Sequence, residues 1–474
     1  MLLLAVVTIA ARAQTFGNPV IGFDEHFYLV VGDRMIHGAL PFVDIFDRKP
    51  VGLFLIYAGI RMLGGEGTIQ YQLVAALFAW ATAVLVHRFA RRIAPPAGAV
   101  AAAIAYLLWL DFLEGEGGQA PVFYNLPMIV AAMLVARAWR SDGRDLAKLG
   151  AAAMLATGVA MQIKYTAVFE GVFFGLALLW TGWRARVGYA RLVGMGALWV
   201  AAALAPTALA WGVYAALGHS REFVFANFIS MFGKLHDDFA TGAEGLAEIV
   251  GILSLVLIIA AFPPPATGAA ERYERRFVQF WLLAAIAGFL AFGAFPSPQY
   301  AMPVLVPAVI AAAPRLGALR WGRTLRWSLL GVAFVAGQLV LASLHVKKGG
   351  AAEAAAVVAA ATPRHGCLYV YDGYPALYRL THTCLLSRYV FPGHLNMANE
   401  ASAKGLGVDP SVEVERIMAA GPETVVDDWP VFEHGNRATH AIVLRHLARD
   451  YHLVLREPTG PNRFRLVYRR NGTS

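Results

Sequence analysis

The chain has 474 residues, of which 58% are hydrophobic and only 15% are charged, and its mean hydropathy is +0.55. An average soluble domain is about 45–50% apolar and about 25% charged, so this composition excludes an ordinary soluble protein and predicts a polytopic α-helical membrane protein. The net charge of +9 does not indicate nucleic-acid binding, because the basic residues cluster in short loops, which is the orientation signal of membrane proteins.

The apolar residues gather in runs that suit helices crossing about 30 Å of hydrocarbon. The run at the N-terminus resembles a signal peptide, but it has no positively charged start and many further runs follow, so we interpret it as the first span. About eleven transmembrane helices are predicted, at about residues 1–14, 68–87, 96–112, 121–138, 146–163, 166–183, 191–216, 245–263, 277–295, 299–314 and 327–345. Residues 1–345 are therefore assigned to a membrane domain.

The loop charges predict the orientation of these helices. If the N-terminus is cytoplasmic, the inside loops carry arginine clusters such as those at 88–92 and 272–276. The outside loops after the first then hold only Lys164, Arg221 and Lys234. This asymmetry predicts a multi-pass membrane protein with the N-terminus cytoplasmic and the C-terminus extracytoplasmic.

The first outside loop, residues 15–67, is predicted to hold two interface helices. Residues 24–37 have helical composition, with Asp24 as the N-cap, and the glycine and proline of 38–41 end that helix. Residues 50–63 are apolar but too short to span the bilayer comfortably, so they are predicted to lie at the interface.

The same loop concentrates charge at one edge of the membrane, and such charges are commonly functional. Asp24 and Glu25 could take a proton from an incoming hydroxyl or amine, or they could be a helix cap and a first-turn acid favoured by the helix dipole. Arg48 and Lys49 could bind a phosphate, or they could anchor the loop by snorkelling to lipid head groups. Spacing alone leaves both pairs of interpretations open.

The second outside loop carries Asp111, Glu114 and Glu116 and no basic residue. These carboxylates could hold a divalent cation or position a polar acceptor, or they could belong to a solvated acidic loop. No spacing of His and Cys predicts zinc, and no phosphate-binding glycine loop or nucleophile motif occurs. No metal ligands are therefore assigned, and a divalent cation is the one cofactor kept open.

Further candidates lie where predicted spans begin or end. Lys164 ends a span, where an ionisable side chain is often functional but could also snorkel. Gln299 and Tyr300 open a span with two prolines, which predicts a broken helix end of the kind that lines cavities. The loop 218–244 could form a lid or simply connect two helices.

Residues 346–474 differ from the rest, because charged helix-like stretches alternate with short strand-like runs. The strand-like runs are 367–371, 423–428, 451–457 and 464–470. This alternation predicts a small extracytoplasmic α/β domain. Its Cys367 and Cys384 are the only cysteines in the chain, and they could pair in an oxidising compartment or remain two thiols.

The run FDEHFYLVVGDRMIHGALPFVDIFDRKPVG joins an acidic pair, a tyrosine, G-x-x-P-F-x-D and Lys-Pro. It resembles the GT-C superfamily of polyprenyl-phosphate-dependent glycosyltransferases, and most nearly the bacterial relatives of protein O-mannosyltransferases and of the lipid A aminoarabinose transferase. The later PSPQYAMPVLVP is similar to the family's R-Y-x-x-P-x-x-P. The resemblance covers about residues 20–345 and implies a GT-C-like membrane domain. It also implies that the protein lies in the plasma membrane, the inner membrane of a bacterium.

The resemblance also implies roles for particular residues. Asp24, with Glu25 beside it, matches the acid that acts as general base or positions the acceptor. Lys49 matches the lysine that contacts the lipid-linked phosphate, and Arg48 and Lys164 would assist it. These cations would stabilise the negative charge that grows on the departing phosphate.

The remaining matches concern the acceptor or the cavity. Asp111 or Glu114 matches the acid of the second outside loop, and Tyr300 matches the tyrosine of the late motif. The chain departs from the family at Gln299, where arginine is common, and this departure weakens a phosphate-binding role for that position.

The function implied is transfer of a hexosyl or pentosyl group from a polyprenyl-phosphate carrier to an acceptor on the extracytoplasmic face. The expected partners are the lipid-linked donor, the bilayer and an acceptor that is a protein, a lipid or a polysaccharide, and no nucleic acid. A secondary transporter or lipid flippase, a glycan polymerase or ligase of the same superfamily, and a non-catalytic scaffold are the alternatives. The absence of an internal sequence repeat disfavours the transporter.

Overall fold

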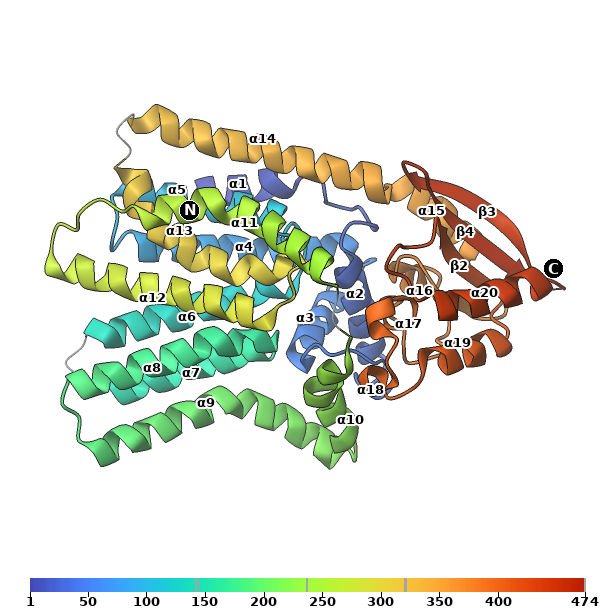
Figure 1. The fold of residues 1–474 in the computed structure, drawn as a ribbon, viewed down its shortest axis with the longest axis horizontal. Coiled ribbons are helices and arrows are strands. Elements are labelled where there is room, and N and C mark those ends of the chain that lie inside the picture. The colour runs from blue at the N-terminus through green and yellow to red at the C-terminus, as the bar shows by residue number, and fades with distance from the viewer. Residues whose placement is uncertain (141–142, 144, 236–237, 319–321, 473–474) are drawn as a thin grey trace. The chain divides into compact units, whose positions relative to one another are not determined.

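The computed structural model describes residues 1–140, 143, 145–235, 238–318 and 322–472. It divides into two compact units (Figure 1). The first unit comprises Met1–Gln14, Leu73–Ala210 and Phe239–Leu341, and the second comprises Thr15–Gln72, Trp211–Asp238 and Ala342–Ser474. The division is therefore not the linear one expected at residue 345, because residues 15–72 group with the C-terminal residues. Residues 236 and 237 of the loop 218–244 lie outside the described residues.

The first unit is built from long apolar helices. They are α1 (Leu2–Arg12), α4 (Thr68–Ala90), α5 (Pro96–Trp109), α6 (Ala120–Arg140), α7 (Leu146–Met161), α8 (Val168–Arg184), α9 (Tyr189–Ala216), α11 (Phe239–Ala261), α12 (Ala269–Phe292), α13 (Met302–Gly317) and α14 (Gly322–Lys348). Every predicted span coincides with one of them. Among the described residues, eight helices are long and apolar enough to cross a membrane, which confirms the polytopic helical membrane protein. The helices α1, α5 and α7 are apolar but shorter.

The helix α13 forms the centre of the first unit. It packs against α5, α11 and α12, and at Gly98 a side chain on α5 would collide with the α13 backbone at Ala313. A single 3₁₀ turn, Pro298–Ala301, precedes α13, which then continues through Pro307 and Pro314. The predicted break is thus confined to the start of the helix, since neighbouring helices let an intramembrane helix tolerate interior prolines.

In the second unit, α2 (Phe23–Ile36) and α3 (Val51–Arg61) form the two predicted helices of the first outside loop. The N-cap of α2 is Gly22, not Asp24 as predicted. Gly22 adopts φ +89°, and a Cβ there would lie 2.9 Å from the Tyr71 hydroxyl. Only glycine accepts this conformation and this space readily, so the N-cap lies two residues before the predicted one and Asp24 lies in the first turn of the helix.

Residues 211–238 add α10 (Ser220–Val224), a π-helical turn (Phe225–Ile229) and a 3₁₀ turn (Ser230–Gly233) to the second unit. The last segment of this unit is a small α/β domain, as predicted. Its helices are α15 (Ala351–Ala361), α16 (Ala376–Leu380), α17 (Gly393–Asn396), α18 (Ala403–Leu406), α19 (Pro410–Ala419) and α20 (Arg437–Asp450).

The sheet of this domain has the strand order β1-β2-β4-β3. Its strands are β1 (Leu368–Val370), β2 (Thr424–Trp429), β3 (Tyr451–Gly460) and β4 (Arg463–Arg470). The strands β1 and β2 are parallel, whereas β4 is antiparallel to both β2 and β3. The helix α15 packs against β2, β3 and β4, and α20 contacts β3.

Cys367 and Cys384 form a disulfide, which decides the question that the sequence left open. The bond joins the residue before β1 to the segment that follows α16. It closes a loop with a sequence separation of 17 residues. Disulfides of this kind persist in oxidising compartments.

We expect the double substitution Cys367→Ser with Cys384→Ser to lower the free energy of unfolding of this domain by about 3 kcal/mol, because the bridge removes loop-closure entropy from the unfolded chain. Thermal unfolding of the purified protein measures this effect, and non-reducing gels should show a faster band for the oxidised wild type only. Equal mobility with and without reductant, together with equal unfolding temperatures, would contradict the expectation.

Candidate functional site

The loop of residues 15–67 brings Asp24 and Lys49 to the same tyrosine. Asp24 and Tyr28 lie one turn apart on α2, and the Tyr28 hydroxyl donates a hydrogen bond to Asp24 Oδ2 at 3.1 Å. The Lys49 Nζ lies 5.4 Å from the centre of the Tyr28 ring and 5.9 Å from that of Phe391. A lysine at these distances is attracted by the ring faces. The acid and the cation named from sequence are therefore neighbours.

Tyr28 is fully buried. Burial, followed by the nearby Asp24 carboxylate, raises the pKa of Tyr28 well above its usual value. The phenol therefore stays protonated and keeps donating to Asp24. Asp24 itself is partly exposed, whereas its neighbour Glu25 is buried. Of the two predicted acids, Asp24 is the one that an incoming molecule can reach.

Asp47 lies next to Lys49 and is buried, with an exposed fraction of 3%. The Lys49 Nζ is 3.7 Å from Asp47 Oδ1, and His394 Nε2 approaches the same oxygen to 3.9 Å. Burial raises the pKa of Asp47, and Lys49 opposes that rise. Burial also lowers the pKa of His394 well below its usual value, and the cations Arg48 and Lys49 add to the effect. His394 therefore approaches Asp47 as a neutral ring, and Lys49 is the cation on this carboxylate.

Arg48 points away from this group and binds Glu400. Its two terminal nitrogens donate to the two Glu400 oxygens at 2.6 and 2.8 Å, and its Nε donates to the Ser230 hydroxyl at 2.7 Å. This bidentate geometry is the strongest that arginine makes with a carboxylate. Arg48 therefore points to Glu400 and does not have a free guanidinium group for the phosphate contact that was predicted for it. Arg48 instead ties the loop to the C-terminal segment.

We expect Glu400→Gln to lower the free energy of unfolding by about 3–5 kcal/mol, because it leaves the Arg48 charge buried without its carboxylate. Replacing both residues with apolar ones, in Arg48→Met with Glu400→Leu, should cost less. Chemical denaturation of the purified protein measures both changes. The control is Arg445→Gln, which removes a strongly exposed ion pair with Glu415 and should leave the unfolding midpoint unchanged. A Glu400→Gln variant as stable as wild type would contradict the assignment.

Lys164 and Tyr300 meet within the first unit. Lys164 is only 8% exposed, and its Nζ lies 3.5 Å from the centre of the Tyr300 ring, which stacks on Phe292. A small cavity of about 20 Å³ lies beside Tyr300, with Thr166 and Glu170 among its lining residues. The side chain of Lys164 is thus packed on an aromatic face and does not snorkel.

The three acids Asp111, Glu114 and Glu116 lie in two places within the first unit. When the Gln299 amide is oriented with its nitrogen toward Glu114, that nitrogen lies 2.7 Å from Glu114 Oε2. Asp111 and Glu116 are 2% and 4% exposed, so the solvated-loop interpretation is wrong for them. Arg12 donates to the backbone of this loop, at Gly115 O. Across the described ranges, no three His, Cys, Asp or Glu side chains are grouped to hold a metal ion.

Sequence reasoning missed three residues that support these groups. Tyr28 lies four residues after Asp24, and this helical spacing could have revealed it. His394 and Glu400 are far from the loop in sequence, and no local pattern pointed to them.

No protein-family model matches the sequence, and the search of curated proteins finds no match either. Solved structures do match. ArnT from Cupriavidus metallidurans, bound to undecaprenyl phosphate, superposes with a TM-score of 0.63 at 15% identity, covering 98% of this chain and 97% of that chain. The apo oligosaccharyltransferase of Archaeoglobus fulgidus gives a TM-score of 0.51 at 9% identity, covering 90% of this chain and 69% of that chain.

Both are glycosyltransferases of the GT-C superfamily. The chain has the GT-C fold. The resemblance drawn from the two sequence motifs is thereby confirmed as a resemblance of structure, and it extends beyond the membrane part to nearly the whole chain in the ArnT comparison. At identities this low, the GT-C fold does not determine the reaction, which depends on the residues of the site.

Proposed function

We propose that this protein is an integral-membrane glycosyltransferase that moves a sugar from a polyprenyl-phosphate carrier to an acceptor on the extracytoplasmic face. The observation that carries the proposal is the contact of both Asp24 and Lys49 with Tyr28. One group accepts a proton and the other compensates a departing phosphate, as such a transfer requires. The GT-C fold supports it, since ArnT shares that fold and was solved with undecaprenyl phosphate bound.

In the proposed reaction, the acceptor oxygen forms a bond to the anomeric carbon of the sugar. The bond from that carbon to the phosphate oxygen of the carrier breaks, and its electron pair stays on the phosphate. The acceptor proton goes to the Asp24 carboxylate. The Lys49 ammonium stabilises the phosphate charge, and Asp47 below it holds the ammonium in place.

As expected from the motifs, Lys164 is assigned to the donor phosphate in the proposed reaction. The acceptor or the cavity is assigned to Asp111, Glu114, Gln299 and Tyr300. Arg48 is reassigned to positioning the loop, because its guanidinium group is paired with the Glu400 carboxylate. The extracytoplasmic placement of the C-terminal domain is supported by the Cys367–Cys384 bridge, which an oxidising compartment favours.

Purified protein in lipid nanodiscs, incubated with a panel of radiolabelled polyprenyl-phosphate sugars, tests the proposal. Release of sugar, or its transfer to an added membrane extract, would establish the reaction and identify hexosyl or pentosyl donors. Parallel reactions with and without EDTA test the need for a divalent cation. No turnover of any donor by folded protein would refute the proposal and favour the transporter or scaffold alternatives.

A further inference from the structure

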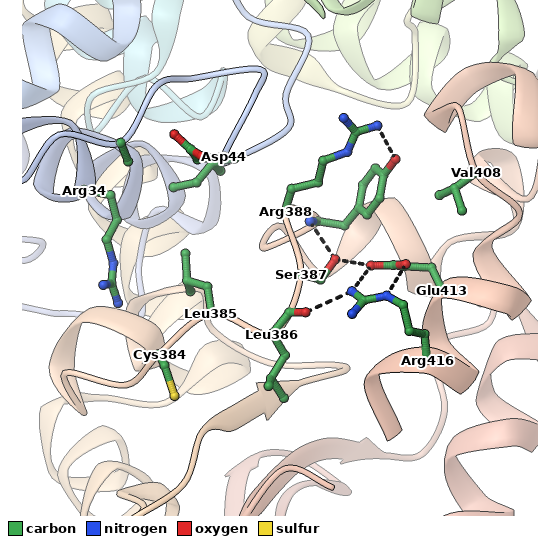
Figure 2. Close-up of a pocket in the computed structure, with 13 residues that line it drawn as sticks. Arg34, Asp44, Cys384, Leu385, Leu386, Ser387, Arg388, Val408, Glu413 and Arg416 are labelled. Atoms are coloured by element: carbon green, nitrogen blue, oxygen red, sulfur yellow. Dashed lines mark hydrogen bonds and ion pairs between the residues drawn. The ribbon is translucent and has the colours of Figure 1, made fainter. Parts of the chain in front are cut away.

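A cavity bordered by charged side chains lies in the second unit, and neither Asp24 nor Lys49 is among its lining residues. It has a volume of about 780 Å³. One wall comes from the end of α2 and the loop after it, through Arg34 and Asp44, and another from α19, through Glu413 and Arg416. The segment 384–389, which we call the strap, runs between them (Figure 2).

The strap is held at both ends. The disulfide fixes Cys384 to the residue before β1. Near the other end, the Arg388 carbonyl accepts a hydrogen bond from the Phe46 backbone at 2.8 Å, and the Tyr389 hydroxyl donates to the Leu406 carbonyl at 2.6 Å. A wall held in this way is pre-organised, so a ligand would not have to order it on binding.

The carboxylates of the cavity already have partners. Glu413 accepts from Arg416 at 2.6 and 2.9 Å and from the Ser387 hydroxyl at 2.5 Å. Asp44 Oδ2 accepts from the Leu40 backbone at 2.6 Å. Five charged side chains border the cavity. These contacts give partners to both carboxylates, Asp44 and Glu413, and they pair Arg416 with Glu413.

Arg34 and Arg388 differ, because within the described ranges neither forms an ion pair with a carboxylate. Arg34 donates to the Thr383 carbonyl, and Arg388 donates to the Tyr389 hydroxyl at 2.8 Å. The Arg388 guanidinium also lies 5.0 Å from the centre of the Tyr389 ring, which fixes its plane. Neutral partners orient both guanidinium groups. Arg388 also interacts electrostatically with Glu413, but among the described residues neither arginine has a carboxylate at ion-pair distance, so both can receive an anion.

We propose that this cavity binds an acidic saccharide, that is, a sugar bearing a carboxylate or phosphate group. A guanidinium fork recognises either anion through paired hydrogen bonds. The cavity is within the range of small-molecule sites and much larger than a free anion needs. Binding of the saccharide in this cavity does not depend on the proposed function.

Saturation-transfer NMR titrations of the full-length protein in nanodiscs test this, with glucuronic acid, glucose 6-phosphate and glucose as probes. At least one acidic sugar should bind ten times or more tightly than glucose, and which one does so distinguishes the carboxylate from the phosphate. Arg34→Gln and Arg388→Gln should each weaken that binding at least tenfold. The control Arg445→Gln, on an exposed arginine outside the cavity, should not change it.

Equal binding of glucose and both acids, or unchanged binding in Arg34→Gln, would overturn the proposal. Arg34→Gln alone keeps the test decisive if Arg388→Gln fails to fold. Asp24→Asn should bind the acidic probe as wild type does, because Asp24 does not line the cavity. Probe binding in a protein that turns over no donor would therefore refute the transferase and leave the saccharide site standing.

Discussion

Asp24→Asn should abolish sugar transfer by the purified protein while leaving its expression and unfolding temperature unchanged. Asparagine has the same shape and can still accept the hydrogen bond from Tyr28 that Asp24 accepts, but it cannot take the acceptor proton. Loss of a general base at this position should lower kcat by about 10²–10⁴-fold. The rate of transfer from a radiolabelled polyprenyl-phosphate sugar, in wild type and variant, gives the result directly.

Two further variants show whether the effect belongs to Asp24. Asp33→Asn removes an acid from the far end of the same helix, where Asp33 pairs with Arg61 at 2.9 Å, and it should transfer sugar at the wild-type rate. Glu25→Gln separates the two neighbouring acids of the first turn. Normal turnover by Asp24→Asn would remove Asp24 from the mechanism. If Glu25→Gln were then inactive, Glu25 and not Asp24 would be the general base.

The second large effect is expected at Lys49. Lys49→Ala removes the ammonium that the proposal places against the departing phosphate, and loss of one such charge-stabilising group should lower kcat by about 10²–10³-fold. Lys49→Arg keeps the charge and should recover part of the rate. Kinetics at varied donor and fixed acceptor concentrations measure the change, which should appear in donor use and not in acceptor binding.

The control for Lys49 must separate catalysis from folding, because Lys49 neighbours the buried Asp47. Asp47→Asn combined with Lys49→Ala removes both charges, so any stability lost through a stranded carboxylate should return while transfer stays absent. Lys404→Ala, on an exposed lysine of α18, should have no effect on either property. Restoration of transfer in the double variant would show that Lys49 acts only through the fold.

Local patterns predicted much of this molecule. Apolar runs predicted the helices of the first unit, because a chain in hydrocarbon must satisfy its own backbone hydrogen bonds. Alternating runs predicted the strands β1 to β4 to within a few residues. The contact of Asp24 with Tyr28 was not predicted, although their spacing of four residues on a helix is compatible with it. Each of these depends on residues close together in sequence, where spacing determines which side chains meet.

The tertiary structure alone decided the remaining features. It grouped residues 15–72 with the C-terminal segment, joined Cys367 to Cys384 and turned Arg48 from a phosphate candidate into the partner of Glu400, 352 residues away. A charged side chain takes whichever opposite charge the fold packs against it, since a buried charge without a partner is costly. By itself, therefore, the sequence determined the elements and the candidate acid and cation, whereas the packing of distant segments determined which charges support them.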